Sequence, residues 1–277
     1  MGWRFIVAPQ WQGSGSSRAM RLIDGAEAIR GDLPSSRTTE IETPPEAGDS
    51  LGTEVGRLSA IVAVRDRLAA ELAAVPAEDA PLLIGGDCGV EAAALDWAVT
   101  NSPDTCVLWF DAHADLNTPG SSPSSAFSGM VLRTALGDGE GVLVPEAPLR
   151  TDRVVLVGVR ATDDAEAEYI AATPIASLGV DAATPETLIA AVEATGATSV
   201  YVHVDLDVLD PADIAGVASA EPFGLPLDSL LGLISGVRTR FPVTGGAIVG
   251  FAPESPVAAV EDLPSILRIL SAITSQR

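Results

Sequence analysis

Short apolar runs recur along the whole chain, separated by longer amphipathic segments. The runs are rich in Val, Ile and Leu at consecutive positions, as are strands buried on both faces of a parallel sheet. They predict strands at 4–8, 81–86, 106–112, 153–159, 174–178, 200–206 and 247–252. The segments between them predict helices near 16–30, 55–76, 89–99, 126–136, 164–172, 184–195, 226–240 and 261–274.

Two of these helices carry clear local signals. Residues 59–75 repeat apolar side chains at i, i+3 and i+4, the pattern of a helix with one buried face. The segment 184–196 begins with Thr184 and Pro185 and ends at Gly196, which are typical start and stop residues. Alternation of strands and helices along all 277 residues predicts one domain, an α/β/α three-layer sandwich with a mostly parallel sheet.

Two polar stretches interrupt the alternation. Residues 31–52 are Pro-rich and too long for an ordinary connection, so we expect a surface excursion there. Residues 117–129 form a Ser/Gly/Pro-rich loop after a predicted strand. Because ligands bind beyond the carboxyl ends of parallel strands, this loop is the expected substrate-binding loop.

Composition excludes several classes of function. The net charge of −22 argues against a nucleic-acid partner, which requires clustered basic residues. All 16 basic residues are arginines, which excludes Schiff-base catalysis by lysine and a Walker-type phosphate loop. No apolar run approaches the ~20 residues of a membrane helix, and the N-terminus lacks signal-peptide features. We therefore expect a cytoplasmic protein with no membrane partner, whose Cys88 and Cys106 stay reduced.

Candidate chemistry is concentrated in two acidic clusters. In "DAHAD", Asp111, His113 and Asp115 alternate, so an extended strand would direct all three to one face. In "HVDLD", Asp205 and Asp207 alternate in the same way. Carboxylates this close repel one another unless a cation lies among them. Four carboxylates and one imidazole suit a pair of ions such as Mn²⁺.

Each cluster also has a simpler interpretation. Either one alone is typical of a polar strand end that runs into a capped turn. His203 is expected to be a partly buried residue of its strand rather than a metal ligand. The occurrence of both clusters at corresponding strand ends favours the paired-metal site.

Three motifs resemble those of the arginase/agmatinase/formiminoglutamase (ureohydrolase) superfamily. The stretches "GGDCGVE", "DAHADLNTP" and "HVDLDVLDP" occur in this order over roughly 125 residues. They resemble the family motifs G-G-D-H-S, D-A-H-x-D and S-x-D-x-D-x-x-D-P. The resemblance implies an arginase-like fold over residues 1–277 and a hydrolase of linear amidines or guanidines.

The resemblance also implies a role for each residue of the two clusters. Asp111 and Asp205 would bridge two divalent ions, preferentially Mn²⁺, with Asp115 completing the first and His113 and Asp207 the second. A metal-bridging hydroxide would attack the guanidinium or formimino carbon. Asp115 would then pass a proton to the departing amine.

Substrate contacts are implied at positions further along the chain. Asn117 and Ser124 fall where relatives hold the substrate α-carboxylate, and Asp163 and Glu166 fall near the α-amino group. Ordinary polar loop residues remain the alternative for all four. An acidic mouth would attract cationic small-molecule substrates. Relatives usually form trimers or hexamers, so the resemblance also implies self-association.

The chain departs from the family pattern at three positions. Cys88 replaces the histidine of G-G-D-H as a ligand of the first metal. Ser128 takes the place of a histidine that shuttles protons in arginases, and is the candidate catalytic residue there. Gly250 stands where relatives carry an acidic residue that grips the guanidinium, with Glu254 displaced by several residues.

These departures change the expected chemistry. A Cys88 thiolate and four aspartates would place five negative charges beside the four positive charges of two divalent ions. We therefore expect a higher pH optimum than in arginases or looser retention of the first metal, with a shift toward Zn²⁺ or Co²⁺. The alternative for Cys88 is a small buried thiol beside an incomplete site. The alternatives for the chain are a catalytically impaired arginase-fold binding or assembly protein, or a formiminoglutamase-type hydrolase.

Overall fold

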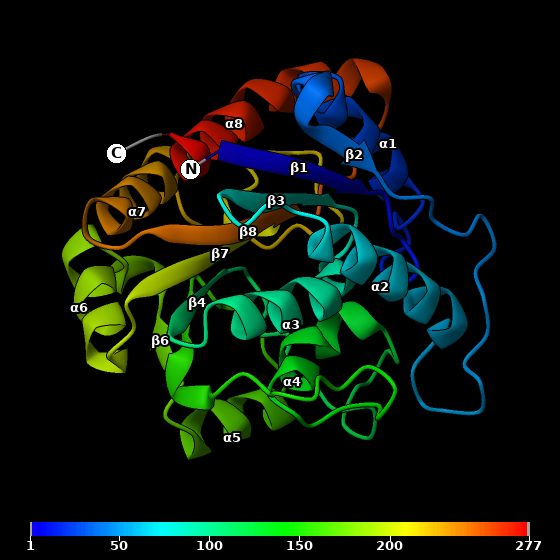
Figure 1. Cartoon of the computed structure of the whole chain (residues 1–277), viewed down its shortest axis with the longest axis horizontal. Coiled ribbons are helices and arrows are strands. Elements are labelled where there is room, and N and C mark those ends of the chain that lie inside the picture. The colour runs from blue at the N-terminus through cyan, green and yellow to red at the C-terminus, as the bar shows by residue number, and fades with distance from the viewer. Residues whose placement is uncertain (1, 276–277) are drawn as a thin grey trace.

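All neighbouring strands of the sheet run parallel in a computed structural model of the chain, which describes residues 2–275 (Figure 1). The eight strands lie in the order β2-β1-β3-β8-β7-β4-β5-β6. Their bounds are β1 (Gly2–Ala8), β2 (Thr38–Glu40), β3 (Asp79–Gly85), β4 (Thr105–Phe110), β5 (Val154–Val157), β6 (Ala176–Leu178), β7 (Ser199–Asp205) and β8 (Val243–Val249).

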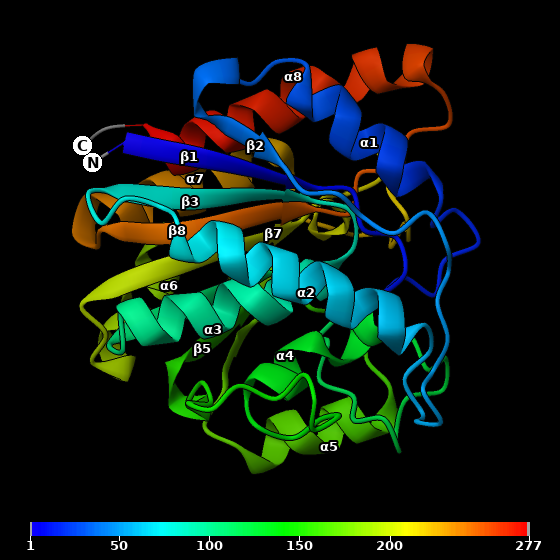
Figure 2. The same cartoon turned by 45° about the vertical axis from the view of Figure 1, so that its right-hand side comes forward.

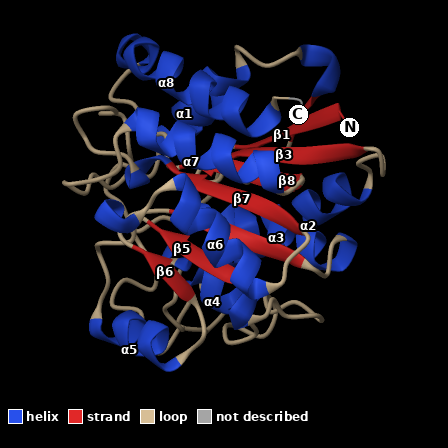
Figure 3. Cartoon of the chain, turned by 90° about the vertical axis from the view of Figure 1, so that its left-hand side faces the viewer, coloured by secondary structure: helices blue, strands red, loops and turns tan. Residues whose placement is uncertain are grey.

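Helices cover both faces of this sheet, as Figures 2 and 3 show. One layer contains α1 (Arg21–Arg30), α6 (Pro185–Thr195), α7 (Leu227–Arg240) and α8 (Pro256–Thr274). The other contains α2 (Leu58–Ala73), α3 (Glu91–Asn101), α4 (Val131–Ala135) and α5 (Asp164–Ala172). The predicted three-layer α/β/α sandwich is confirmed, and the sheet is wholly parallel.

Each face of the sheet has its own hydrophobic core. Along β1, Phe5 and Val7 pack into the core beneath α1 and α8, whereas Ile6 and Ala8 pack into the core beneath α2 and α3. Successive strand residues point to opposite faces, so a strand covered on both sides needs apolar residues at every position. This requirement explains the continuous apolar runs of the sequence.

The structure differs from the sequence prediction in several local details. β2 lies within 31–52, where only a surface excursion was expected, because its three polar residues carry no apolar signal. The helix expected at 126–136 is divided into a 3₁₀ turn (Phe127–Met130) and the short α4. β4 ends at Phe110, one residue before the first acidic cluster. No helix among the described residues is long and apolar enough to cross a membrane.

The topology creates a crevice at the carboxyl edge of the sheet. After β3 the chain crosses to β4, and the gap between these strands is filled later by β7 and β8. In open α/β sheets, such a change in strand order marks the ligand-binding site. The segments that follow β3, β8, β7 and β4 are therefore neighbours at this edge.

Two glycines in helices provide a matched test of the packing. A methyl group at Gly25 in α1 would lie 2.0 Å from the backbone oxygen of Phe251, whereas one at Gly232 in α7 meets nothing within 4 Å. We expect Gly25→Ala to lower the free energy of unfolding by about 1–3 kcal/mol through overpacking. Gly232→Ala is expected to raise it by about 0.5–1 kcal/mol, because alanine favours the helix. Denaturant unfolding measures both changes, and shifts of the same sign would contradict this packing.

Candidate metal centre

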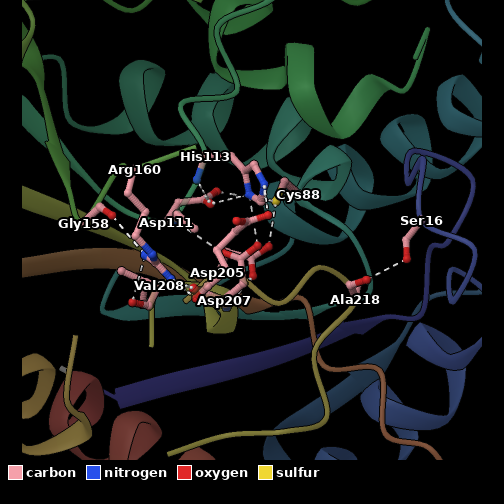
Figure 4. Close-up of polar contacts among 12 residues, drawn as sticks. Ser16, Cys88, Asp111, His113, Gly158, Arg160, Asp205, Asp207, Val208 and Ala218 are labelled. Carbon is pink, nitrogen blue, oxygen red and sulfur yellow. Dashed lines mark hydrogen bonds and ion pairs between the residues drawn. The ribbon is translucent and has the colours of Figure 1, made fainter. Parts of the chain in front are cut away.

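The acidic residues predicted from the sequence converge at the carboxyl edge of the sheet. Cys88 begins a 3₁₀ turn after β3, and Asp205 is the last residue of β7, with Asp207 in the next turn. Asp111 and His113 follow β4. Figure 4 shows these five side chains directed toward one another.

The segment after β4 reaches this site through a turn rather than an extended strand. His113 makes a single bridge to Ala161, and Asp115 adopts a left-handed backbone conformation with φ of 53°. The backbone N–H of His113 donates to Asp111 Oδ1 at 2.7 Å. The expectation that 111, 113 and 115 alternate on one face of a continuous strand is therefore wrong. Local turn geometry gathers these side chains instead.

Asp111 belongs to two separate groups of potential metal donors. Its carboxylate, Cys88 Sγ and a nitrogen of His203 all lie within 4.8 Å of one another. The same spacing holds for Asp111, His113 and Asp207, where His113 Nδ1 is 3.1 Å from Asp207 Oδ2. Two donor sets that share one carboxylate are what a pair of bridged ions requires.

Asp205 and Asp115 complete the acidic cluster. Asp205 Oδ2 accepts from the Cys88 thiol at 3.1 Å, and Asp205 Oδ1 accepts from the backbone N–H of Asp207. Asp115 is 4% exposed, and its Oδ2 has no hydrogen-bond partner among the described residues. A buried carboxylate oxygen without a donor is costly unless a cation neutralises it. The donor set and this orphaned oxygen both fit a metal centre.

Burial and mutual repulsion shift the pKa values of the cluster. Burial, followed by the charges of neighbouring aspartates, raises the pKa of Asp115, Asp205 and Asp207 above the usual value. Burial opposes the charge on His113, but its hydrogen bonds with Asp111 and Asp207 outweigh this effect and raise its pKa to about 12. Protons therefore hold the cluster together in the absence of metal, and a bound cation would displace them.

Cys88 and Asp111 respond to the same environment in opposite ways. Burial, and then the charges of Asp115, Asp205 and Asp111, raise the pKa of the Cys88 thiol well above its usual range. Burial also acts to raise the pKa of Asp111, but the nearby imidazoles of His113 and His203 lower it overall. Cys88 is therefore a neutral thiol until a cation stabilises the thiolate.

A cavity of about 540 Å³ opens above the cluster. Its walls include every residue that the sequence predicted for substrate binding or proton transfer: Asp115, Asn117, Ser124, Ser128, Asp163 and Glu166. None of the described lining residues is an arginine. A cavity lined with several carboxylates and, among its described residues, no arginine favours a positively charged ligand.

Asn117, Asp163 and Glu166 hold one another at the cavity wall. Asn117 Nδ2 donates to Asp163 Oδ2 at 2.7 Å. Asp163 caps α5 by accepting from the backbone N–H of Glu166, and Glu166 accepts in return from Asp163. Glu166 also accepts from the backbone N–H of Leu116. These contacts join the loop after β4 to α5, and the substrate roles of the three residues stay predictions.

The positions that depart from the family pattern also lie at this cavity. Ser128 donates its backbone N–H to the Gly13 carbonyl, and its side chain lines the cavity. Gly250 follows β8 with φ of 86°, and a Cβ there would lie 2.2 Å from Asp205 Oδ1. No larger residue fits at 250 unless Asp205 moves. Glu254 is exposed and is not among the lining residues.

Two residues of the site were not predicted from the sequence. His203 was expected to be partly buried and not a ligand, but it is fully buried and faces Cys88 and Asp111. Glu91, at the start of α3, is also fully buried and contacts His203. The signal for Glu91 was an acidic residue directly before an apolar run at the start of a predicted helix.

Comparisons with known proteins agree with this geometry. A sequence model described as the Arginase family matches residues 24–260. An arginase from Bacillus caldovelox is 31% identical over 208 residues, which cover 70% of this chain and 67% of the relative. N(omega)-hydroxy-L-arginine amidinohydrolase from Streptomyces lavendulae is 29% identical, with 74% of this chain and 70% of the relative covered.

Solved structures show the same fold. An arginase from Entamoeba histolytica superposes with a TM-score of 0.88 at 21% identity, and the superposition covers 99% of each chain. The parallel sheet, the shared-carboxylate donor groups and the family match over most of the sequence lead to one conclusion. The chain belongs to the arginase family.

Proposed function

We propose that the protein is a metal-dependent hydrolase that cleaves C–N bonds of linear amidines or guanidines. The observation that carries this proposal is the pair of donor groups sharing Asp111 on the floor of an acidic cavity. Two divalent ions, when bound, supply a water acidic enough to attack a guanidinium or formimino carbon at neutral pH.

The protein's own residues have distinct tasks in this proposal. Asp111 and Asp205 would be shared by the two ions, Cys88 and Asp115 would help to hold the first, and His113 and Asp207 would help to hold the second. Asp115 Oδ2 has no other partner among the described residues, so once an ion displaces its own proton it is free to accept the proton that the attacking water releases. Asp115 would then pass that water-derived proton to the departing amine as the C–N bond breaks.

The cavity supports a substrate other than unmodified arginine. Gly250 cannot carry an acidic clamp, and Ser128 is a weaker proton carrier than histidine. Both features favour substrates with better leaving groups, including formimino compounds and N-hydroxyguanidines. The relative in Streptomyces lavendulae is named for hydrolysis of N-hydroxyarginine. The proposal also includes a cytoplasmic location and self-association.

Metal binding is expected to stabilise the protein, and more strongly at higher pH. The pKa values of Asp115, Asp205, Asp207 and His113 are raised in the metal-free fold, so these groups retain protons that a cation must displace. As pH rises, fewer protons compete, while the repulsion among aspartates grows and weakens the metal-free fold. At a metal concentration a hundredfold above Kd, the gain is about 2.7 kcal/mol.

Calorimetry at pH 5 and pH 8, with chelator or with added metal, measures this effect. The metal-induced rise in Tm is expected to be larger at pH 8. Asp111→Asn, which removes the shared carboxylate, is the control and should show little rise at either pH. A Tm that metals do not change at any pH would contradict the proposed centre.

A substrate panel tests the activity directly. The protein is incubated with Mn²⁺, Co²⁺ or Zn²⁺ and with arginine, agmatine, guanidinobutyrate, hydroxyarginine or formiminoglutamate, and urea, hydroxyurea, formamide and ammonia are assayed. We expect hydroxyarginine or formiminoglutamate to be turned over faster than arginine. Asp115→Asn should lower kcat by about 10²–10⁴-fold. A folded, metal-loaded protein that is silent on the whole panel would favour a catalytically impaired binding or assembly protein.

A further inference from the structure

His203 is held in one position by contacts on three sides. Its side chain is fully buried in β7 and stacks on Trp109, its partner in β4, with ring centroids 3.5 Å apart. His203 Nδ1 lies 2.8 Å from Glu91 Oε1, and the Tyr201 hydroxyl donates to Glu91 Oε2 at 2.8 Å. The imidazole therefore has a fixed place and orientation before any ligand binds.

The other ring nitrogen of His203 faces the acidic cluster. Because the Glu91 carboxylate can only accept a hydrogen bond, Nδ1 donates its proton to Glu91, and Nε2 is the nitrogen directed at the cluster. Nε2 has no hydrogen-bond partner among the described residues and lies 3.8 Å from Asp111 Oδ2. A buried ring nitrogen without a partner beside a carboxylate is unfavourable unless a proton or a metal ion lies between the two groups, and a metal ion would take the place of that proton.

We propose that His203 is a ligand of the first metal ion and supplies the imidazole that Cys88 does not. In the family motifs, histidine follows G-G-D and serine stands two residues before the first aspartate of S-x-D-x-D. This chain has Cys88 at the first position and His203 at the second. The imidazole of this donor group thus comes from β7 rather than from the turn after β3. The inference rests on the metal centre of the proposed function.

Glu91 is the positioning residue for this ligand. A carboxylate that accepts from one ring nitrogen fixes the tautomer and leaves the other nitrogen for the metal. Glu91 is fully buried and engages both His203 and Tyr201. It occupies the first position of α3, so the helix itself sets where the imidazole points.

The two ions would then have different surroundings. The first is held by the sulfur of Cys88, the nitrogen of His203 and carboxylate oxygens, and the second by His113 and carboxylate oxygens. Sulfur and nitrogen donors favour Zn²⁺ and Co²⁺, whereas an oxygen-rich set suits Mn²⁺. The two metal sites therefore differ in their preferred ion, and the softer ion occupies the site formed by Cys88 after β3 and His203 in β7.

Metal content and affinity test this inference without measuring turnover. The wild type and variants are loaded with Co²⁺ or Zn²⁺, dialysed, and analysed by mass spectrometry of the metals and by titration calorimetry. We expect two ions per chain in the wild type and one in His203→Ser. The double variant Cys88→His/His203→Ser restores the family arrangement and should recover the second ion. The thiolate-to-Co²⁺ absorption of the wild type should be absent in the double variant.

Two further variants separate ligand loss from general damage to the fold. Glu91→Gln retains the imidazole but weakens its orientation, and should lower affinity for the first ion about 10–100-fold while the second is unchanged. Asp207→Asn is the matched control, because it removes a ligand of the second ion only. Circular dichroism confirms that each variant is folded.

Three results would overturn the inference, and they differ in scope. A folded His203→Ser variant that binds two ions with wild-type affinity would show that His203 only packs against Trp109. If that variant does not fold, an unchanged first-ion affinity in Glu91→Gln overturns the inference equally. A wild-type protein that binds no metal under any condition would instead remove the metal centre, and the proposed function with it.

Discussion

Electrostatic repulsion among buried aspartates is the constraint on which this structure depends. Asp111, Asp115, Asp205 and Asp207 are nearly inaccessible to solvent and lie at the ends of two neighbouring strands. Without a cation, raised pKa values and shared protons are what allow them to remain together. Concentrating negative charge in this way lowers the stability of the metal-free fold. The same charge can bind a cationic ligand, so such clusters are typical of functional sites.

The parallel sheet makes this concentration possible. Its apolar strands are buried on both faces, and the crossover from β3 to β4 leaves β7 and β8 between them. The carboxyl ends of four adjacent strands therefore supply groups from distant parts of the sequence to one crevice. The segments after β7 and β8 are tightly packed in this crevice, because even a methyl group at Gly250 would overlap the Asp205 side chain.

Much of the fold and part of the site could be predicted from the sequence. Apolar runs mark strands buried on both sides, and the α5 helix begins and ends where its pattern predicts. The aspartates at the ends of β4 and β7 were identified because charge directly after an apolar run is conspicuous. β2 was missed because its three residues are all polar and show no pattern of hydrophobic positions that would indicate a strand.

Other parts of the site depend on contacts between distant segments. The turn at Asp115 cannot be inferred from alternation, since it replaces the strand that alternation assumes. The direction of His203 depends on Trp109 in the neighbouring strand and on Glu91 in α3, more than 90 residues away in sequence. Only the assembled structure shows that its free nitrogen faces the donor group of Cys88 and Asp111.

A crystal structure determined with Zn²⁺ and Mn²⁺ present, using anomalous scattering to distinguish the two metals, tests the central claim most directly. We expect two anomalous peaks, one on either side of the Asp111 carboxylate, with the metal beside Cys88 also bonded to His203 Nε2. A well-ordered map that shows only water between these side chains would contradict it.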